Sequence, residues 1–378
     1  MSGYLLDEEG KLLVQMAREF AEKELKPRVA DCDRNGEFPL DLYQRAAELG
    51  LSYLEIPEQY GGPEVNYVTV GAVYEEIGRI DAGFAISMAA SSLGYKPILL
   101  GGSPEQNKLY ADAIMAGKFV SFALTEPNAG SDNSAISTTA VRKGDEYILN
   151  GTKCFITNGG VADLCTVFAT VDPSKGIRGL TCFIVEKGTP GFSSGKEENK
   201  MGIRLSNTTE VIFRDVRIPA SNLVGREGGG FKLAMNTLDL ARCAIGPFAV
   251  GIAQRALEES VTYAKNRVQF GKPISALQAI QFILADMAIR TETARQMAAH
   301  ALTLAELGQP YGLEGAIAKC YSADIAVQNA LDAIQIMGGY GYSRDFPVEK
   351  LLRDAKIFQI FEGTNQIQRA VIASHIMR

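Results

Sequence analysis

Apolar residues recur at helical spacing through the first third of the chain. Leu13, Met16 and Phe20 fall on one face of a helix that begins after the N-cap residue Asp7 and stops at Pro27. Later segments show a similar pattern, and a Ser-Pro-Glu start opens the last of them. We therefore predict further helices over residues 40–49, 68–79, 82–101 and 103–116.

Near residue 119 the pattern changes from helical spacing to short strands. The Asn150-Gly151 pair is the strongest short signal for a β-hairpin, so we predict a turn there. Lys143-Gly144 is a further turn signal. Strands are predicted over residues 119–126, 139–150, 152–157, 164–171, 180–185, 209–213 and 216–218.

Glycines at 228–230 end the region of strands, and long periodic helices follow over residues 231–266, 277–307 and 313–337. Long helices of this kind pack into a bundle. The order of elements predicts an α+β multidomain fold. Its parts are an N-terminal helical domain (1–118), a middle β-sheet domain (119–228) and a C-terminal helical bundle (229–378).

Composition narrows the class of protein. The 378 residues carry a net charge of −6, which argues against nucleic acid as a partner. Two distant histidines and six cysteines without a CxxC pair make a metal site unexpected, and the cysteines are expected to be reduced and buried. No apolar run reaches the length of a membrane span, and no targeting segment is visible. We expect a cytoplasmic protein, with a processed mitochondrial matrix form as the alternative.

Residues 123–132 form a polar segment that follows a strand. Thr125 and Ser131 supply hydroxyls, and Gly130 allows a ligand to approach the backbone closely. The alternative is an ordinary β-turn capped by Asp132. On the next strands, Phe155 and Thr157 share a face and could meet a flat heteroaromatic ligand, although cross-strand packing would also explain them.

The C-terminal third holds three more candidates. Arg267 ends a long helix, where it suits the helix dipole or a phosphate equally well. The glycines of residues 335–342 lack the spacing of a dinucleotide fingerprint and also fit a helix C-cap. Glu362 lies in an apolar stretch, where desolvation raises the pKa of a carboxyl and suits it to act as a general base. The alternative is that Glu362 starts the last helix, with Thr364 as N-cap.

Two segments, residues 123–132 and residues 335–369, resemble signatures of the acyl-CoA dehydrogenase family, and the resemblance extends over essentially the whole chain. It implies FAD bound between the middle domain and the C-terminal helices, in a homotetramer. The implied cofactor-binding residues are Phe122, Leu124, Thr125, Gly130, Ser131, Phe155, Ile156, Thr157, Thr364 and Gln366, joined by Arg267, Phe270, Gln278, Gln335, Gly338 and Gly339 from a neighbouring subunit.

The same resemblance implies α,β-dehydrogenation of an acyl-CoA thioester, as in fatty acid β-oxidation. Glu362 matches the family's base for the α-proton, while the β-hydrogen leaves as hydride to flavin N5 and an electron-transferring flavoprotein takes the electrons. The implied substrate-binding residues are Ser131, Asp239, Arg242 and Gly363.

Two alanines indicate which branch of the family, and so which class of substrate, the chain resembles. Ala241 stands where isovaleryl- and long-chain-type members carry the base, and Ala85 stands where glutaryl-type members carry an arginine. A short-chain, butyryl-type substrate is therefore expected. The alternatives are a medium- or branched-chain dehydrogenase, an enoyl-CoA reductase, an oxidase, and a scaffold that has lost its activity.

Overall fold

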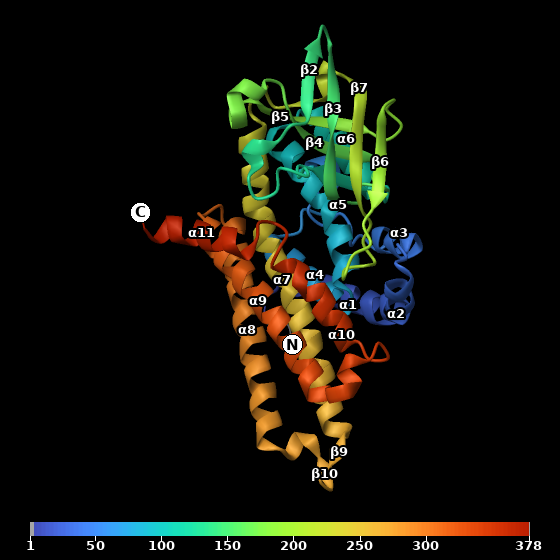
Figure 1. The fold of residues 1–378 in the computed structure, drawn as a ribbon, viewed down its shortest axis with the longest axis vertical. Coiled ribbons are helices and arrows are strands. Elements are labelled where there is room, and N and C mark those ends of the chain that lie inside the picture. The colour runs from blue at the N-terminus through green and yellow to red at the C-terminus, as the bar shows by residue number, and fades with distance from the viewer. Residues whose placement is uncertain (1–3, 378) are drawn as a thin grey trace.

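The computed structural model describes residues 4–377, and its elements confirm an α+β fold with helical parts on either side of a central sheet. The sheet lies at one end of an elongated molecule, and the long helix α7 runs from it to the small hairpin β9–β10 at the other end (Figure 1). The helices are α1 (Glu8–Phe20), α2 (Lys26–Asn35), α3 (Leu40–Glu48), α4 (Tyr67–Ile80), α5 (Ala82–Gly101), α6 (Pro104–Met115), α7 (Gly230–Asn266), α8 (Gln278–Glu306), α9 (Gly312–Met337), α10 (Val348–Phe358) and α11 (Asn365–Ile376).

The strands form one large mixed sheet in the order β6-β7-β3-β2-β4-β5-β8, with β1 parallel to β4. A separate two-stranded sheet joins β9 and β10. The strands are β1 (Val120–Ala123), β2 (Thr139–Lys143), β3 (Glu146–Thr157), β4 (Leu164–Thr170), β5 (Leu180–Glu186), β6 (Phe192–Glu197), β7 (Thr208–Pro219), β8 (Leu223–Val224), β9 (Val268–Gln269) and β10 (Lys272–Pro273).

The first helix starts as predicted but does not stop at Pro27. The Asp7 carboxylate caps it by accepting a hydrogen bond of 2.7 Å from the backbone N–H of Gly10. A π-helical turn, Ala21–Leu25, then leads directly into α2, so the predicted stop was wrong. Pro27 lies in the first turn of α2, where the N–H that proline lacks is needed least.

The predicted turn at Asn150-Gly151 was also wrong. The chain turns after Lys143, and β3 runs straight through the Asn-Gly pair. The pair marks a β-bulge instead, where the backbone N–H of Asp215 donates to Asn150 Oδ1 at 2.8 Å. A Cβ atom at Gly151 would lie 2.8 Å from the Cα atom of Thr138, so the close approach of the backbone requires glycine here.

The same bulge explains a second difference. Two strands were predicted over residues 209–213 and 216–218, but both belong to the single strand β7. Asp215 has a φ of 51°, so the irregularity that looked like a strand end is a kink within the strand. Strand β6 was not predicted, because its edge position leaves it mostly exposed and polar.

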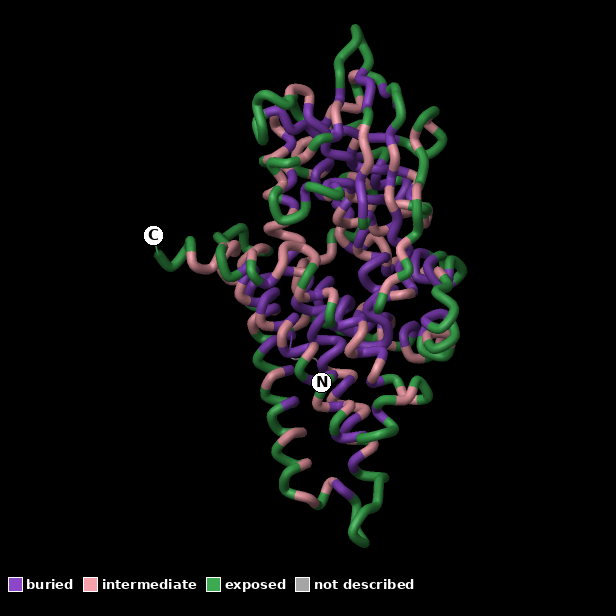
Figure 2. Tube along the Cα trace, in the orientation of Figure 1, coloured by how far each residue is buried: buried purple, intermediate pink, exposed green. Residues whose placement is uncertain are grey.

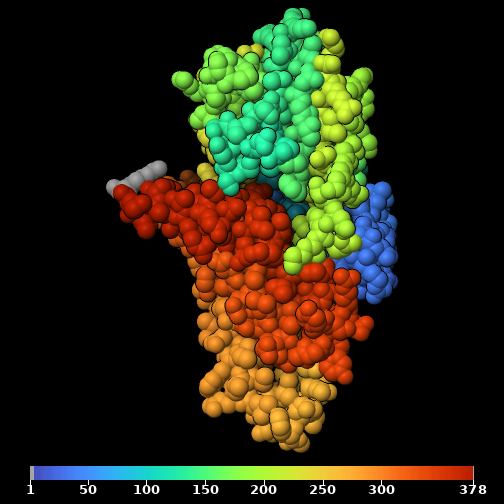
Figure 3. Space-filling model, in the orientation of Figure 1, coloured from blue at the N-terminus to red at the C-terminus, as the bar shows by residue number. Residues whose placement is uncertain are grey.

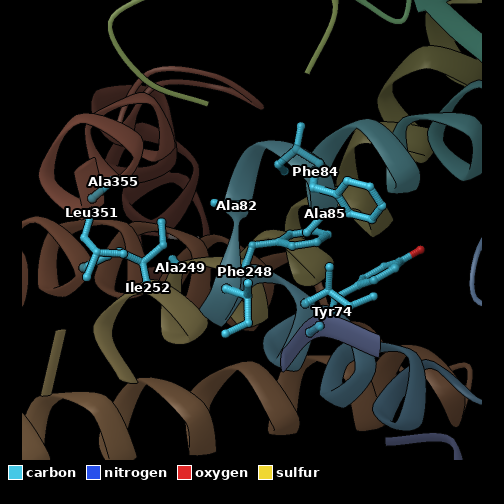
Figure 4. Close-up of a cluster of buried hydrophobic side chains, with 14 of the residues drawn as sticks. Tyr74, Ala82, Phe84, Ala85, Phe248, Ala249, Ile252, Leu351 and Ala355 are labelled. Atoms are coloured by element: carbon cyan, nitrogen blue, oxygen red, sulfur yellow. The ribbon is translucent and has the colours of Figure 1, made fainter. Parts of the chain in front are cut away.

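The main apolar core joins helices from both ends of the sequence. Tyr74 of α4 stacks on Phe248 of α7 with ring centroids 4.8 Å apart (Figure 4). Tyr43 stacks on Phe84 with ring centroids 4.1 Å apart. Helices α4 and α7 touch so closely that a Cβ atom on Gly251 would lie 2.5 Å from a backbone oxygen of α4. Buried residues run along the centre of the molecule (Figure 2). The core therefore gives the middle of the molecule rigid walls.

A buried polar cluster fixes α10 to the rest of the molecule. Lys350 pairs with Asp81, the N-cap residue of α5, and with Asp354 one helical turn away. Asp354 also accepts a hydrogen bond of 2.6 Å from the backbone N–H of Ile203, which lies in the loop before β7. Three distant segments of the sequence thus meet at α10.

All six cysteines are free and buried, as expected. Among residues 4–377 no helix is both long and apolar enough to cross a membrane.

Candidate active site

A cavity of about 100 Å³ lies between helices α4, α5 and α7 and the turn that follows α10. Its walls are largely apolar, with side chains from all three helices. They include Val70, Ile86, Ala89, Ala90, Leu93, Leu240, Ala244, Ile245 and Phe248. The space-filling view shows a recess where the strands meet the C-terminal helices (Figure 3). An apolar cavity with few polar groups is typical of a small-molecule site.

Glu362 contributes its carboxyl group to this cavity. It lies in the turn between α10 and α11 with a φ of 53°, a left-handed conformation that non-glycine residues seldom adopt. Its Oε2 atom is buried and has no hydrogen-bond partner in the described part of the chain. Such local strain and an unpaired buried carboxylate oxygen are both features of functional sites.

The surroundings of Glu362 bring the protonated and deprotonated forms of its carboxyl close to balance near neutral pH. Burial raises the pKa of its carboxyl to about 7, although the positive charges of Arg242 and Lys319 oppose the shift. Arg242 itself pairs with Asp239 at 3.0 Å on α7, and its Nε atom is buried without a partner among residues 4–377. Arg242 thus links Asp239, with which it pairs, to Glu362, on whose pKa its charge acts.

The turn at Glu362 is held through its backbone. Lys319 of α9 donates to the carbonyl oxygen of Gly363 at 2.7 Å, and the side-chain amide of Gln368 donates to the carbonyl oxygen of Glu362 at 3.0 Å. The hydroxyl of Thr364 caps α11 by accepting from a backbone N–H at 3.2 Å. The cap interpretation of this segment is confirmed for Thr364, but it leaves the Glu362 carboxyl free to face the cavity.

The polar segment after β1 is fixed against β3 by buried contacts. Glu126 and Lys153 form a buried ion pair with an N–O distance of 2.7 Å, and Lys153 also donates to the carbonyl oxygen of Leu124 at 3.0 Å. The backbone N–H of Cys154 donates to the carbonyl oxygen of Thr125 at 3.0 Å. The backbone of Thr125 is therefore held just after the end of β1, against β3.

Phe155 and Thr157 lie beside this segment. Phe155 is 66% exposed and has a φ of 57°, so the cross-strand packing alternative was wrong for this ring. Thr157 lines the cavity. The side chains of Leu124 and Ile156 are buried, which leaves only their backbone groups for a ligand, whereas Gly130, Ser131 and Gln366 are exposed. The Phe122 ring is half-buried and packs against Phe168.

The other predicted cofactor residues lie far from this part of the sheet. Arg267 and Phe270 belong to the hairpin region of β9 and β10, at the opposite end of the molecule (Figure 1). The Arg267 guanidinium lies 5.6 Å from the centre of the Tyr340 ring, beside an open cavity that Gly338 and Gly339 also line. All six residues of this group (Arg267, Phe270, Gln278, Gln335, Gly338 and Gly339) are exposed. Within residues 4–377 of a single chain, the group around Arg267 therefore does not meet the cofactor-binding candidates near Thr125 and Phe155.

A second polar group in the main cavity was missed by the sequence analysis. Glu55 and Lys96 form an ion pair with side chains that are only 10% and 9% exposed. Tyr74 donates to Glu55 at 3.1 Å, and Lys96 lies 4.8 Å from the centre of the Tyr67 ring. We call these four residues the Glu55–Lys96 cluster. The signal was present, because Lys96 is the one charged residue in the helix over 82–101.

Comparison with known proteins identifies the family. The acyl-CoA dehydrogenase N-terminal, middle and C-terminal domain models match residues 7–118, 121–216 and 228–377. The chain belongs to the acyl-CoA dehydrogenase family. It is 47% identical to an acyl-CoA dehydrogenase of Bacillus subtilis, over 98% of each chain. It is 44% identical to the acryloyl-CoA reductase (NADH) of Anaerotignum propionicum, over 99% of this chain and 96% of the other.

Solved structures agree with this assignment. Butyryl-CoA dehydrogenase of Megasphaera elsdenii matches with a TM-score of 0.97 and 43% identity, over 99% of this chain and 100% of the other. A chain from a structure described as the electron transferring flavoprotein of Acidaminococcus fermentans also matches with a TM-score of 0.97, at 46% identity over 99% of both chains. This acyl-CoA dehydrogenase family member is therefore an FAD-dependent oxidoreductase.

The residues near the ends of β1 and β3 fit this cofactor. An exposed aromatic ring at Phe155 offers a face to a flat ring system, and Thr125 and Thr157 add hydroxyls that can hydrogen-bond its heteroatoms. The unpaired carboxylate oxygen of Glu362 belongs to the same cavity as Thr157. The site thus places a candidate base next to the candidate cofactor-binding surface.

Proposed function

We propose that this protein catalyses the α,β-dehydrogenation of a short-chain acyl-CoA thioester, with Glu362 as the base that removes the α-proton. The observation that carries the proposal is the buried Oε2 atom of Glu362, which lies in an apolar cavity and has no hydrogen-bond partner in the part of the chain that the structure describes. A carboxyl whose pKa is raised to about 7 is matched to proton transfer near neutral pH.

The backbone around Glu362 prepares the substrate for proton removal. The N–H of Glu362 donates to no acceptor within residues 4–377, so it is free to bind the thioester carbonyl oxygen. Such a hydrogen bond stabilises the negative charge that develops when the α-proton leaves. Lys319 and Gln368 hold the carbonyls of this turn and keep the N–H in place. FAD, when bound, accepts the β-hydrogen as a hydride.

The remaining residues of the site bind and orient the substrate. Arg242, held by Asp239, would fix the CoA chain and the turn that carries the base. The apolar walls exclude water, which strengthens the hydrogen bonds to the carbonyl. The small cavity and the alanine at position 241 favour a short acyl chain. The reverse reaction, reduction of an enoyl-CoA, uses the same residues, and the 44% identity to an acryloyl-CoA reductase keeps it as the second candidate.

The arrangement of the cofactor residues supports a homo-oligomer with shared sites, for which we propose a tetramer. Arg267 and the glycines near it lie close to the β9–β10 hairpin, at the opposite end of the molecule from the sheet that carries Phe155, so a second subunit is needed to complete the set. Substitution Arg267→Ala should weaken FAD binding about 10–100-fold, because a guanidinium bonded to phosphate is lost. Titration of apoenzyme with FAD measures this, with Arg28→Ala on the exposed face of α2 as control. Unchanged FAD affinity would reject the shared site.

Electron transfer to an electron-transferring flavoprotein is part of the proposal. It is supported by the matching chain from a structure described under that name. The domain boundaries at residues 118 and 228 stay predictions, although the ranges of the family matches lie close to them.

An anaerobic titration with acyl-CoA thioesters of increasing length tests the proposed function. Bleaching of the flavin absorption by butyryl-CoA supports both the chemistry and the short-chain substrate. Bleaching only by longer or branched thioesters keeps the chemistry and rejects the substrate class. Absence of bleaching with every thioester, in a protein that holds FAD, rejects the proposed reaction.

A further inference from the structure

The Glu55–Lys96 cluster is unexpected in a cavity that binds saturated acyl chains. Both charged side chains line the same cavity as Glu362, and both are nearly buried. Taking two charges out of water costs free energy that their attraction does not reliably return, so a buried pair is weak evidence for a stabilising role. The walls around it are apolar, which makes the pair stand out as a place where a ligand could be recognised.

The cluster has spare hydrogen-bonding capacity. The Lys96 ammonium carries three N–H groups and meets Glu55 and Tyr67, which leaves at least one N–H without an acceptor in the described residues. The Glu55 carboxylate accepts from Lys96 and Tyr74, and two oxygens can accept further bonds. A donor and an acceptor are thus available side by side on the cavity wall.

The charge state of the cluster narrows what it could bind. Burial alone would lower the pKa of Lys96, but the neighbouring Glu55 carboxylate raises it above its usual value, so the ammonium stays charged. The pair is then neutral as a whole. A carboxylate on the ligand would be a second anion beside Glu55, and an amine would be a second cation beside Lys96. A terminal methyl group would exclude water from the spare N–H of Lys96 and the spare acceptor of Glu55 without giving either a hydrogen bond.

A hydroxyl group meets all three conditions, because it is neutral, accepts from an ammonium and donates to a carboxylate. We infer that the Glu55–Lys96 cluster is a specificity site for a hydroxyl at the far end of the acyl chain. The preferred substrate is then an acyl-CoA thioester whose chain crosses the apolar part of the cavity and ends in a hydroxyl. This inference rests on the proposed function, since it takes Glu362 as the reacting end of the cavity.

The two ends are electrostatically separate, which suits a chain lying between them. The groups that shift the pKa of Glu362 are Arg242 and Lys319, and neither member of the ion pair is among them. A change at Glu55 or Lys96 should therefore alter which chain is accepted without altering the base.

Pairs of thioesters with equal length test the inference in the holoenzyme. Butyryl-, pentanoyl-, hexanoyl- and octanoyl-CoA are each compared with the ω-hydroxy thioester in which a hydroxyl replaces the terminal methyl. At the length that reaches the cluster, kcat/KM should favour the hydroxy member about 10–100-fold, because hydrogen bonds to charged groups are strong. The double variant Glu55→Leu with Lys96→Met should lose or invert this preference. Both charges leave together in that variant, so no unpaired charge stays buried.

The matched control is the double variant Lys108→Met with Asp112→Leu, which removes an exposed ion pair on α6 and should keep the wild-type preference. A preference for the alkanoyl member at every length in the wild-type enzyme overturns the inference without needing any variant. So does a hydroxyl preference that survives in the double variant, or a stronger preference for ω-carboxy thioesters. If no thioester reduces the flavin, the proposed reaction fails. Calorimetric Kd values for the same pairs then decide the inference alone, since a hydroxyl preference in binding supports it and equal binding overturns it.

Discussion

Two glutamates line the same cavity, and their carboxylates have opposite surroundings. Glu362 has a buried oxygen with no hydrogen-bond partner among residues 4–377, and burial raises the pKa of its carboxyl to about 7. Glu55 accepts from Lys96 and Tyr74 and is neutralised by the ammonium beside it. The backbone differs as well, because Glu362 has a left-handed φ of 53° and Glu55 is not among the residues with positive φ.

These different surroundings suit the Glu362 carboxyl to proton transfer and the Glu55 carboxylate to binding a ligand. An unpaired buried carboxylate is costly to keep and can lower that cost by taking a proton, which is what a general base does. A carboxylate that accepts hydrogen bonds from an ammonium and a phenol is a fixed hydrogen-bond acceptor. The same side chain at two positions of one cavity is thus suited to proton transfer in one case and to ligand binding in the other.

Substitution Glu362→Gln should give the largest effect. Glutamine has nearly the same shape but cannot take the α-proton, so the rate of flavin reduction by the best acyl-CoA should fall by at least ~10³-fold. FAD content and thioester binding should stay close to those of the wild type. Stopped-flow absorbance under anaerobic conditions measures the rate, and calorimetry measures binding.

The control is Glu48→Gln, at an exposed position on α3 where Glu48 pairs with Arg45 on the surface. That variant should reduce the flavin at the wild-type rate. Retention of more than a small fraction of activity in Glu362→Gln would remove Glu362 from the role of base, and with it the contrast between the two glutamates.

The sequence predicted Glu362 and missed Glu55 for a physical reason. Apolar neighbours in the sequence made Glu362 a candidate base with a helix-cap alternative, and the resemblance to the family favoured the base. The partners of Glu55 are 41 and 19 residues away, and only the packing of α4 and α5 brings them to it. Lys96 in an otherwise uncharged helix was a signal for a buried cation, but its position could not name the partner.

The fold, too, could be predicted from the sequence only where local patterns determine it. Helix ranges from periodicity were close to those observed, and Asp7 and Thr364 cap helices as predicted. Predictions from short sequence motifs were wrong where contacts with distant residues determine the local structure. Asn150-Gly151 has the composition of a hairpin turn, yet pairing with Asp215 across the sheet converts it into a bulge. The exposed group around Arg267 completes no site within one chain, and the sequence could suggest this only through resemblance.

Substitution Lys96→Met tests the surroundings of Glu55 through the stability of the protein. It leaves the Glu55 carboxylate buried with one hydrogen bond from Tyr74 and no counter-charge, which should cost about 3–5 kcal/mol in the free energy of unfolding. Denaturant unfolding of the holoenzyme measures the change. Lys108→Met breaks an exposed ion pair on α6 and should cost less than about 1 kcal/mol. Equal costs for the two variants would mean that Glu55 is solvated or neutral, contrary to the comparison.

The pH dependence of the reaction should follow the carboxyl of Glu362. A base must be deprotonated to act, and its raised pKa of about 7 places the loss of activity below that pH. The rate of flavin reduction at low thioester concentration should therefore fall about tenfold per pH unit below pH 7 and level off above it. Stopped-flow rates across this range measure the profile. A rate that stays constant down to pH 5 would contradict the raised pKa.

Substitution Tyr74→Phe should have the smallest effect, because it weakens the surroundings of Glu55 without removing the counter-charge. The variant loses the hydrogen bond of 3.1 Å to Glu55 but keeps the ring that stacks on Phe248. We expect a cost of about 1 kcal/mol in the free energy of unfolding, the usual value for one such bond. Tyr342→Phe is the control, because that side chain is 86% exposed and its variant should be unchanged within about 0.5 kcal/mol. A cost for Tyr74→Phe as large as that for Lys96→Met would show that the phenol, and not the ammonium, keeps the Glu55 carboxylate stable in the cavity.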